Sequence, residues 1–302
     1  MSFEQTIRSA IEFTGVGLHS GAPVRMRILP AAAGTGIVFR RVDLDGFMVE
    51  AVGRNVAKVS YATSLMKKGV LISTTEHLLS AFLGLGLDNA IVELDSLELP
   101  ILDGSALPIV QAVLGAGLRK QRRPRVYMCI RREVEVREGG KSIAVYPADS
   151  YRVHYRIDFP HPLVGLQEFM VELTNGSYLR QIASARTFGF LRDEAVLRNM
   201  GLIRGASEEN AIVLTDDGIK NPPLRFRDEF VRHKVLDLIG DLALLGHPLL
   251  GRVEADRAGH AMHAALVSRL LRDHSLWELA TLSSADQERA QAAALDGVAQ
   301  PV

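Results

Sequence analysis

The chain has 302 residues, and its 35 lysines and arginines balance its 35 aspartates and glutamates. This length suits about two domains, and the balanced charge gives no basic field of the kind that nucleic-acid binding requires. The single cysteine, Cys129, excludes an intramolecular disulfide framework and suits a reducing compartment. The sequence has neither a signal-peptide pattern nor an apolar run of about 18 residues. We therefore expect a soluble, cytoplasmic protein without a transmembrane segment.

The first third of the chain contains three segments with the apolar pattern of strands. These segments are VRMRILP (24–30), GIVFR (36–40) and NAIVEL (89–94). Between the second and the third, the run from Ser73 to Leu83 predicts a helix, because Ser73 and Glu76 have the Ser-x-x-Glu spacing of a capping box. Glu76 and His77 then have two interpretations. They are a helix cap and a core histidine, or they are a metal ligand with a carboxylate beside it.

The metal interpretation has a specific chemistry. A catalytic zinc typically has three protein ligands, often His with Asp or Glu, and keeps one position open for water. The bound ion lowers the pKa of that water to about 7, and an adjacent carboxylate can accept its proton. A further ligand elsewhere in the chain is needed to favour this interpretation over a helix cap.

The basic, proline-containing stretch 119–125 is the expected junction between two domains, 1–122 and 125–282. Two segments that follow it, 125–138 and 142–148, have the alternating pattern of strands. Basic residues in a linker are usually solvated, so this stretch does not indicate a nucleic-acid site.

The helix predicted from Phe230 to Gly246 carries a narrow polar stripe on an otherwise apolar surface. A helix of this kind is buried nearly all round, and buried charges are costly unless they are paired or bind a metal. The i, i+4 spacing places His233 and Asp237 on successive turns of one face. The stripe is therefore a core ion-pair network, with Lys234 bridging Asp237 and Asp241, or it is part of a metal site.

The two halves share a similar order. Each has an apolar helix with a histidine seven residues before a glycine, His77 to Gly84 and His233 to Gly240, and a strand-like run follows each helix. This order suggests two related halves. The polar, alanine-rich segment 283–302 has no packing pattern, and we expect it to be a flexible tail.

Seven long blocks identify a family. They are TGVGLHSG (14–21), TGIVFRRVDL (35–44), STTEHLLSAFLGLGLDNAIVEL (73–94), PILDGSA (100–106), ARTFGF (185–190), RFRDEFVRHKVLDLIGDLALLGH (225–247) and AGHAMH (258–263). In this order they closely resemble the zinc-dependent UDP-3-O-acyl-N-acetylglucosamine deacetylases, which catalyse the committed step of lipid A biosynthesis. The resemblance covers about residues 5 to 275.

The resemblance implies an α+β fold. Two similar βααβ domains pack their helices against each other, and the active site lies between the domains. A small β-α-β insert near 188–218 forms an apolar passage for the acyl chain of the substrate. Glu208 stands in this insert where an apolar residue is usual, so it faces outward or the passage is shorter here.

The resemblance also assigns the catalytic groups. The zinc ligands correspond to His77, His233 and Asp237, a set that also suits ferrous iron, and the general base corresponds to Glu76. The other catalytic positions are His260, Asp241 and Thr187. The resemblance implies that a protonated His260, oriented by Asp241, stabilises the oxyanion or protonates the amine, and that Thr187 supplies an oxyanion-side hydroxyl.

The expected partner is the acylated UDP-N-acetylglucosamine substrate, and we expect the protein to act as a monomer. The resemblance places Phe188 and Phe190 beside the sugar and acyl chain, Asp158 and Phe159 near the uracil, and Lys141 near the diphosphate. Three further substrate positions are Lys234, Asp193 and His19. Four further histidines are expected to be structural or to lie on the surface: His161, His247, His263 and His274.

The expected reaction is hydrolysis of the N-acetyl amide, with release of acetate and a free glucosamine amine. Two alternatives remain. Another zinc amidohydrolase would keep the metal ligands but would not need Lys141, Asp158 and Phe159 around a nucleotide. A non-catalytic lipid-binding protein would have no reason to keep Glu76 and His260 beside intact ligands.

Overall fold

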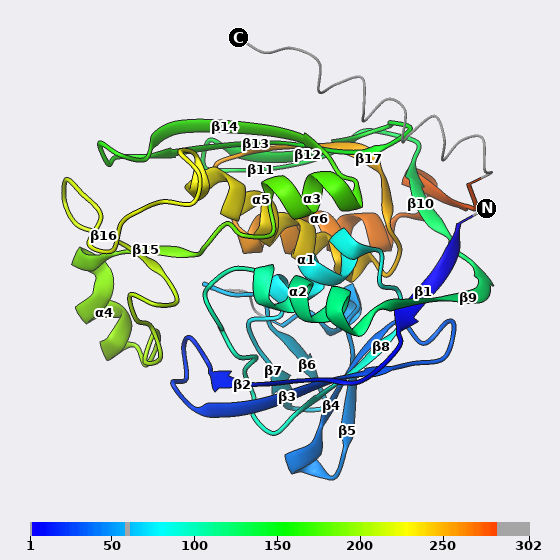
Figure 1. Ribbon diagram of the computed structural model, residues 1–302. Coiled ribbons are helices and arrows are strands. Elements are labelled where there is room, and N and C mark those ends of the chain that lie inside the picture. Colours follow the sequence, from blue (N-terminus) through cyan, green and yellow to red (C-terminus); the bar gives the residue numbers. More distant parts are fainter. Residues whose placement is uncertain (1, 58–60, 283–302) are drawn as a thin grey trace.

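The computed structural model of the protein describes residues 2–57 and 61–282, and its fold is of the predicted α+β class. Two sheets form the outer layers, and the longer helices lie between them (Figure 1). Within the described ranges, no helix is long and apolar enough to cross a membrane. The tail expected at 283–302 lies outside the described residues.

The first sheet has five strands in the order β2-β3-β8-β4-β5. Their bounds are β2 (Ile11–Val16), β3 (Pro23–Pro30), β4 (Ile37–Arg41), β5 (Phe47–Glu50) and β8 (Ala90–Leu94). The predicted strands 24–30, 36–40 and 89–94 are confirmed to within one residue. β4 and β8 are parallel neighbours, and a parallel pair needs a long crossover, usually a helix. That crossover contains α1 (Glu76–Leu85), and α2 (Leu107–Ala116) follows β8.

The second sheet has seven strands, in which β11-β12-β17-β10-β18 form one path and β13 joins β17 to β14. Their bounds are β10 (Tyr127–Ile130), β11 (Val134–Glu138), β12 (Lys141–Tyr146), β13 (Tyr151–Phe159), β14 (Gly165–Glu172), β17 (Leu249–Asp256) and β18 (Trp277–Ala280). β13 and β17 are parallel, and their crossover contains α5 (Glu229–Leu242). The helix α6 (His260–Arg272) follows β17. Both halves therefore repeat the order strand, helix, parallel strand, helix.

The basic stretch expected as a linker is instead a strand. β9 (Leu118–Pro124) pairs antiparallel with β1 (Phe3–Ile7). Its polar side chains also have partners, because Gln121 donates to the Ala31 carbonyl and Arg123 pairs with a glutamate of β1. The division into 1–122 and 125–282 stays a prediction, with its boundary at the end of this strand.

Two small units extend from the layers. β15 (Phe188–Phe190), α4 (Glu194–Asn199) and β16 (Ile212–Leu214) form the predicted β-α-β insert, with its two strands parallel. The hairpin β6 (Leu65–Lys67) and β7 (Val70–Ile72) lies before α1. The helix α3 and the short 3-10 turns complete the described elements: Asn175–Gln181 for α3, and Val42–Leu44, Gly53–Asn55, Leu191–Asp193, Ala243–Leu245 and His274–Leu276 for the turns.

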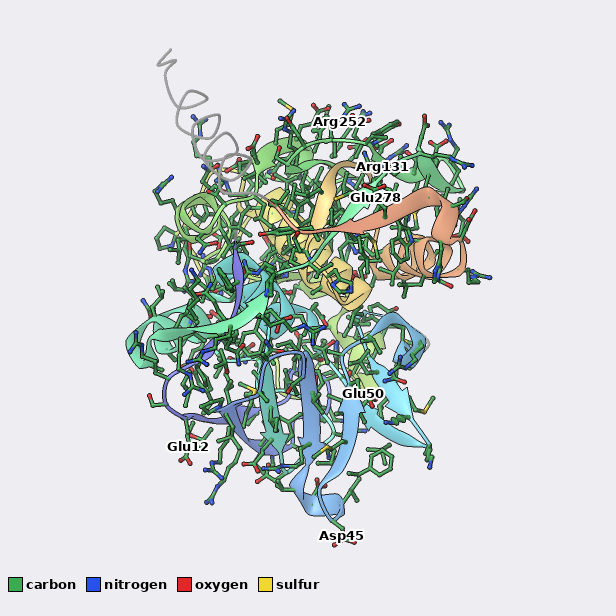
Figure 2. All side chains as sticks on the ribbon, turned by 90° about the vertical axis from the view of Figure 1, so that its right-hand side faces the viewer. Glu12, Asp45, Glu50, Arg131, Arg252 and Glu278 are labelled. Atoms are coloured by element: carbon green, nitrogen blue, oxygen red, sulfur yellow. The ribbon has the colours of Figure 1, made fainter. Side chains whose placement is uncertain are left out.

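The hydrophobic core continues from one sheet to the other through the helices. Every residue of α5 except Arg232 and Lys234 is buried, as its apolar surface predicts. Charged side chains such as Arg131, Arg252 and Asp45 lie on the outside of the two layers (Figure 2). The buried polar stripe of α5 therefore lies between the layers, where an unpaired charge is costly.

Candidate active site and metal centre

A glycine sets the distance between the two central helices. A Cβ atom at Gly240 of α5 would lie only 2.0 Å from the carbonyl oxygen of Glu76. Because glycine has no Cβ, α5 can contact the first turn of α1 directly. This close packing brings His77, the second residue of α1, to the polar stripe of α5.

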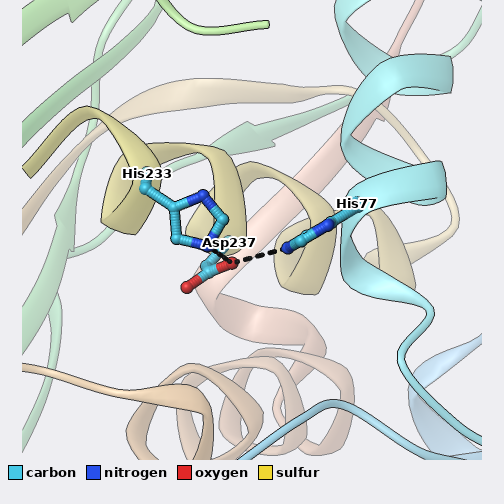
Figure 3. Close-up of side chains that lie close together, drawn as sticks. All are labelled: His77, His233 and Asp237. Carbon is cyan, nitrogen blue, oxygen red and sulfur yellow. Dashed lines mark ion pairs between the residues drawn. The ribbon is translucent and has the colours of Figure 1, made fainter. Parts of the chain in front are cut away.

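Three side chains meet where these helices touch (Figure 3). Oδ1 of Asp237 lies 3.3 Å from Nε2 of His233 and 3.6 Å from Nε2 of His77. All three residues are buried, and their potential ligand atoms lie within 4.8 Å of one another. Ligands about 2.0 Å from a tetrahedral zinc ion are roughly 3.3 Å apart. The spacing and the donor types therefore fit one metal ion shared by the three groups.

The protonation states of this group also suit a metal. Nδ1 of His233 lies 3.1 Å from the Ala185 carbonyl oxygen, to which it can donate, and this leaves Nε2 with its lone pair facing Asp237. Burial lowers the pKa of His233 to about 3, so the ring is neutral. Burial opposes ionisation of Asp237, but its interactions with the neighbouring His233 ring, the Lys234 ammonium and His77 outweigh burial and hold the pKa of this carboxyl well below its usual range.

Lys234 does not bridge two aspartates, as the ion-pair interpretation expected. Its Nζ lies 2.6 Å from Oδ2 of Asp237, whereas Asp241 faces His260 and His263. Lys234 therefore occupies one carboxylate oxygen of Asp237 and leaves the other directed at the two imidazoles. This arrangement favours the metal interpretation of the stripe.

The predicted capping box is wrong. The helix begins at Glu76 with Thr75 as its N-cap residue, without a side-chain capping bond, and the Ser73 hydroxyl bonds to that of Ser64 instead. Oε2 of Glu76 accepts a hydrogen bond of 3.1 Å from the Thr63 backbone, and Oε1 lies 4.0 Å from Nε2 of His260. Glu76 is thus free of the helix end and directed into the site.

His260 and Glu76 are two titratable side chains that face each other in the site. Burial alone would lower the pKa of His260, but Asp241, Asp237 and Glu76 raise it to about 9. Burial raises the pKa of Glu76, and the neighbouring His260 and His77 rings partly offset that effect. A carboxyl group and an imidazole with shifted pKa values, held in one buried site, are typical of groups that transfer protons in catalysis. Nδ1 of His260 is 2.7 Å from Oδ2 of Asp241, as the predicted orienting role requires.

The contacts of His263 and Thr63 with Asp241 were not predicted from the sequence. His263, expected to be structural or on the surface, is fully buried, and its Nδ1 lies 2.8 Å from Oδ2 of Asp241. The available signal was its i, i+3 spacing from His260, which places both on one helix face. Asp241, His260 and His263 also lie within metal-binding distances of one another, but their contacts of 2.7 and 2.8 Å are those of hydrogen bonds.

Residues 4–272 match the sequence family described as UDP-3-O-acyl N-acetylglycosamine deacetylase. The chain belongs to this family. A protein from Solibacter usitatus named UDP-3-O-acyl-N-acetylglucosamine deacetylase is 56% identical over 282 residues, which cover 93% of this chain and 95% of the relative. Proteins with the same name from Myxococcus xanthus and Xylella fastidiosa are 45% and 43% identical, over 91% and 96% of this chain and 88% and 96% of the respective relatives.

In this member of the deacetylase family, the predicted aromatic positions gather beside the metal group. The ring centroid of Phe159 lies 5.7 Å from that of Phe188 and 5.8 Å from that of Phe190. Phe188 in turn lies 6.4 Å from the ring of His233, and Nζ of Lys234 lies 5.8 Å from the Phe188 centroid. Phe159, Phe188 and Phe190 therefore form an aromatic cluster next to the predicted metal ligands.

Other predicted positions lie at the edges. Lys141, Asp158 and Asp193 are exposed at element ends, and the structure does not test their roles. Thr187 stands just before β15, with its amide bonded to Gly104, and its predicted role also stays open. Both ring nitrogens of His19 are buried without a hydrogen-bond partner among the described residues.

The structure shows in which direction Glu208 of the β-α-β insert points. Its side chain is 47% exposed and forms an ion pair of 2.7 Å with Lys220. The carboxylate therefore faces outward, and its departure from the family pattern does not by itself narrow the predicted acyl passage.

Proposed function

We propose that this protein hydrolyses the N-acetyl amide of UDP-3-O-(hydroxyacyl)-N-acetylglucosamine, the committed step of lipid A biosynthesis, and that it does so in the cytoplasm. This proposal rests on the arrangement of five side chains in one buried site. Glu76 and His260 converge to 4.0 Å beside a group of two histidines and one aspartate, in a chain of the deacetylase family.

His77, His233 and Asp237 would hold the metal ion, which we propose to be zinc, with ferrous iron as the alternative. Bound there, the ion supplies a Lewis acid for the acetyl carbonyl and lowers the pKa of a water molecule. The buried, neutral His233 and the ionised Asp237 are the protonation states that ligation requires. Lys234 keeps the second oxygen of Asp237 in place.

The remaining residues move protons and stabilise charge. Glu76 accepts a proton from the attacking water, which a carboxyl with a raised pKa can later return. The protonated His260 donates a hydrogen bond to the oxyanion that develops on the acetyl carbon, and the Thr187 hydroxyl assists it. Glu76 or His260 then delivers a proton to the leaving nitrogen, while Asp241 holds the imidazolium of His260 in orientation.

Substrate recognition follows the predicted positions. Phe188 and Phe190 would contact the sugar and acyl chain, which is supported by the proximity of Phe188 to His233. The other proposed contacts are Lys234 with the sugar side, Asp158 and Phe159 with the uracil, Lys141 with the diphosphate, and Asp193 and His19 elsewhere along the substrate.

The test combines metal analysis with acetate release. We expect about one zinc ion per chain and rapid release of acetate from the acylated UDP-sugar, with little from free N-acetylglucosamine. Equal turnover of both compounds would favour a different sugar deacetylase. No acetate release by protein with a full complement of zinc would refute the proposal.

A further inference from the structure

The carboxylate of Asp241 is held at both of its oxygens. Its Oδ1 accepts a hydrogen bond from the Thr63 hydroxyl. Its Oδ2 lies 2.7 Å from Nδ1 of His260 and 2.8 Å from Nδ1 of His263. Asp241 and its partners join three parts of the chain, because Thr63 precedes β6, Asp241 lies in α5 and both histidines lie in α6. Asp241 itself is only 2% exposed, so water does not substitute for these bonds.

The ring of His263 lies between Asp241 and Tyr155. Its Nδ1 reaches Asp241, and its Nε2 lies 3.2 Å from the hydroxyl of Tyr155. That hydroxyl in turn donates to the Ala258 carbonyl, just before α6. His263 is fully buried and its ring centroid lies 5.9 Å from that of His260. His263 can therefore hold the Asp241 carboxylate in place, but it is too deeply buried to contact a substrate.

Thr63 connects the two catalytic groups. Its hydroxyl reaches Asp241 and lies 3.2 Å from Nδ1 of His260, while its backbone amide donates to Oε2 of Glu76. The carbonyl of Thr63 accepts bonds from the amide and hydroxyl of Thr75, the residue at the start of α1. One residue thus ties the base at the start of α1 to the Asp241–His260 pair.

We propose that Thr63 and His263 are positioning residues, which orient the Asp241 carboxylate and, through it, the imidazole of His260. This inference rests on the proposed deacetylation. The terminal torsion of an aspartate is broad, so a single bond to His260 would leave the carboxylate free to turn. Two further bonds restrict it, and a misplacement of about 1 Å in a catalytic group can cost on the order of a hundredfold in rate.

Paired substitutions test the two positions. His263→Leu removes the donor to Asp241, whereas His263→Asn keeps an N–H at a similar distance from the backbone. Thr63→Val removes the hydroxyl at nearly constant volume, and Thr63→Ser keeps it. We expect the Leu and Val variants to lose about tenfold or more in kcat, as for a lost hydrogen bond to a charged group. KM and bound zinc should stay near those of the wild type, and Asn and Ser should restore most of the rate.

A matched control separates positioning from stability. Thr6→Val removes another fully buried threonine hydroxyl, which accepts a bond from the Ala31 amide in the N-terminal part of the chain. It should lower the melting temperature and leave kcat unchanged.

Unchanged kcat in both His263→Leu and Thr63→Val would overturn the inference. It would also be overturned if both members of each pair lost kcat equally and in proportion to their loss of melting temperature. Failure of the wild type, loaded with zinc, to release acetate would instead refute the proposed deacetylation.

Discussion

The catalytic centre and the substrate-side surface differ in how firmly the fold holds their residues. In the centre, Glu76, Asp237 and Asp241 are buried and contact residues of other elements. On the substrate side, Asp158 and Asp193 are exposed at the ends of a strand and of a 3-10 turn. Helix packing thus holds the proposed catalytic residues in place, whereas the proposed recognition residues lie at exposed element ends. Substitutions in the centre should lower kcat, and those at the edges should act through KM or not at all.

The largest effect should follow the loss of a metal ligand. His233→Ala removes one of three proposed ligands, and a metal's Lewis acidity supplies several kcal/mol of transition-state stabilisation. We expect activity to fall by more than about a thousandfold and bound zinc to be lost. The fold should persist, because the core that surrounds the site is large and apolar.

Zinc content, acetate release and circular dichroism measured together will check this prediction. His274→Ala changes an exposed histidine and should leave all three unchanged. Stoichiometric zinc with near-normal turnover in the His233 variant would remove this residue from the ligand set.

The acid–base pair should give a bell-shaped pH profile. Glu76 must be ionised to accept a proton, and burial raises its pKa, so the rate should fall as pH drops through that raised value. His260 must be protonated. Burial opposes this, but Asp241 and its neighbours raise the pKa of His260 to about 9, so the rate should fall as pH rises through about 9. Because these groups interact, each limb reports the coupled site.

The variant His260→Ala tests this assignment. By analogy with the loss of an oxyanion donor, kcat should fall about a hundredfold, and the basic limb near the pKa of His260 should disappear. The measurement is kcat against pH for the variant and the wild type. An unaltered kcat would show that His260 has no part in the mechanism.

The contact between α1 and α5 should be sensitive to one methyl group. A Cβ at Gly240 would lie 2.0 Å from the Glu76 carbonyl oxygen, so Gly240→Ala must separate the helices. We expect a loss of about 1–3 kcal/mol in the free energy of unfolding and weaker metal binding.

Gly115→Ala is the matched control for this substitution. It lies in α2, where nothing is found within 4 Å of the added atom, and it should raise the free energy of unfolding by up to about 1 kcal/mol. Urea denaturation will measure both variants. If the free energy of unfolding of Gly240→Ala equalled that of the wild type, Gly240 would not set the spacing between α1 and α5.

Much of this centre could be predicted because its signals are local. The i, i+4 stripe of α5 and the apolar faces around it predicted a buried helix with an ion-pair network or part of a metal site, and three strands were predicted to within a residue. The hydrogen bonds of Ser73 could not be predicted in this way. Its pairing with Ser64 depends on a neighbouring segment, and a capping pattern does not encode such a contact.

Long-range contacts account for the other errors. Gln121 and Arg123 lie in a strand because β1, more than a hundred residues earlier in the chain, supplies its partner. His263 and Thr63 lie at the site because α6 and the segment before β6 both contact Asp241 of α5. Helical spacing alone places His263 on the face of His260, but it does not show what that face contacts.

The smallest effect is expected at Glu208, on the substrate side. Its carboxylate is about half exposed and paired with Lys220, and exposed ion pairs contribute only about 0–1 kcal/mol. Glu208→Leu should therefore leave stability and the dependence of kcat/KM on acyl-chain length nearly unchanged. If the carboxylate faced the passage, its removal would favour long chains, because each buried methylene contributes about 0.8 kcal/mol. A chain-length series on the wild type, Glu208→Leu and the exposed neighbour variant Glu209→Leu distinguishes these cases. Parallel profiles in all three agree with an outward Glu208, and a selective gain with long-acyl substrates in Glu208→Leu alone would place this residue at the passage.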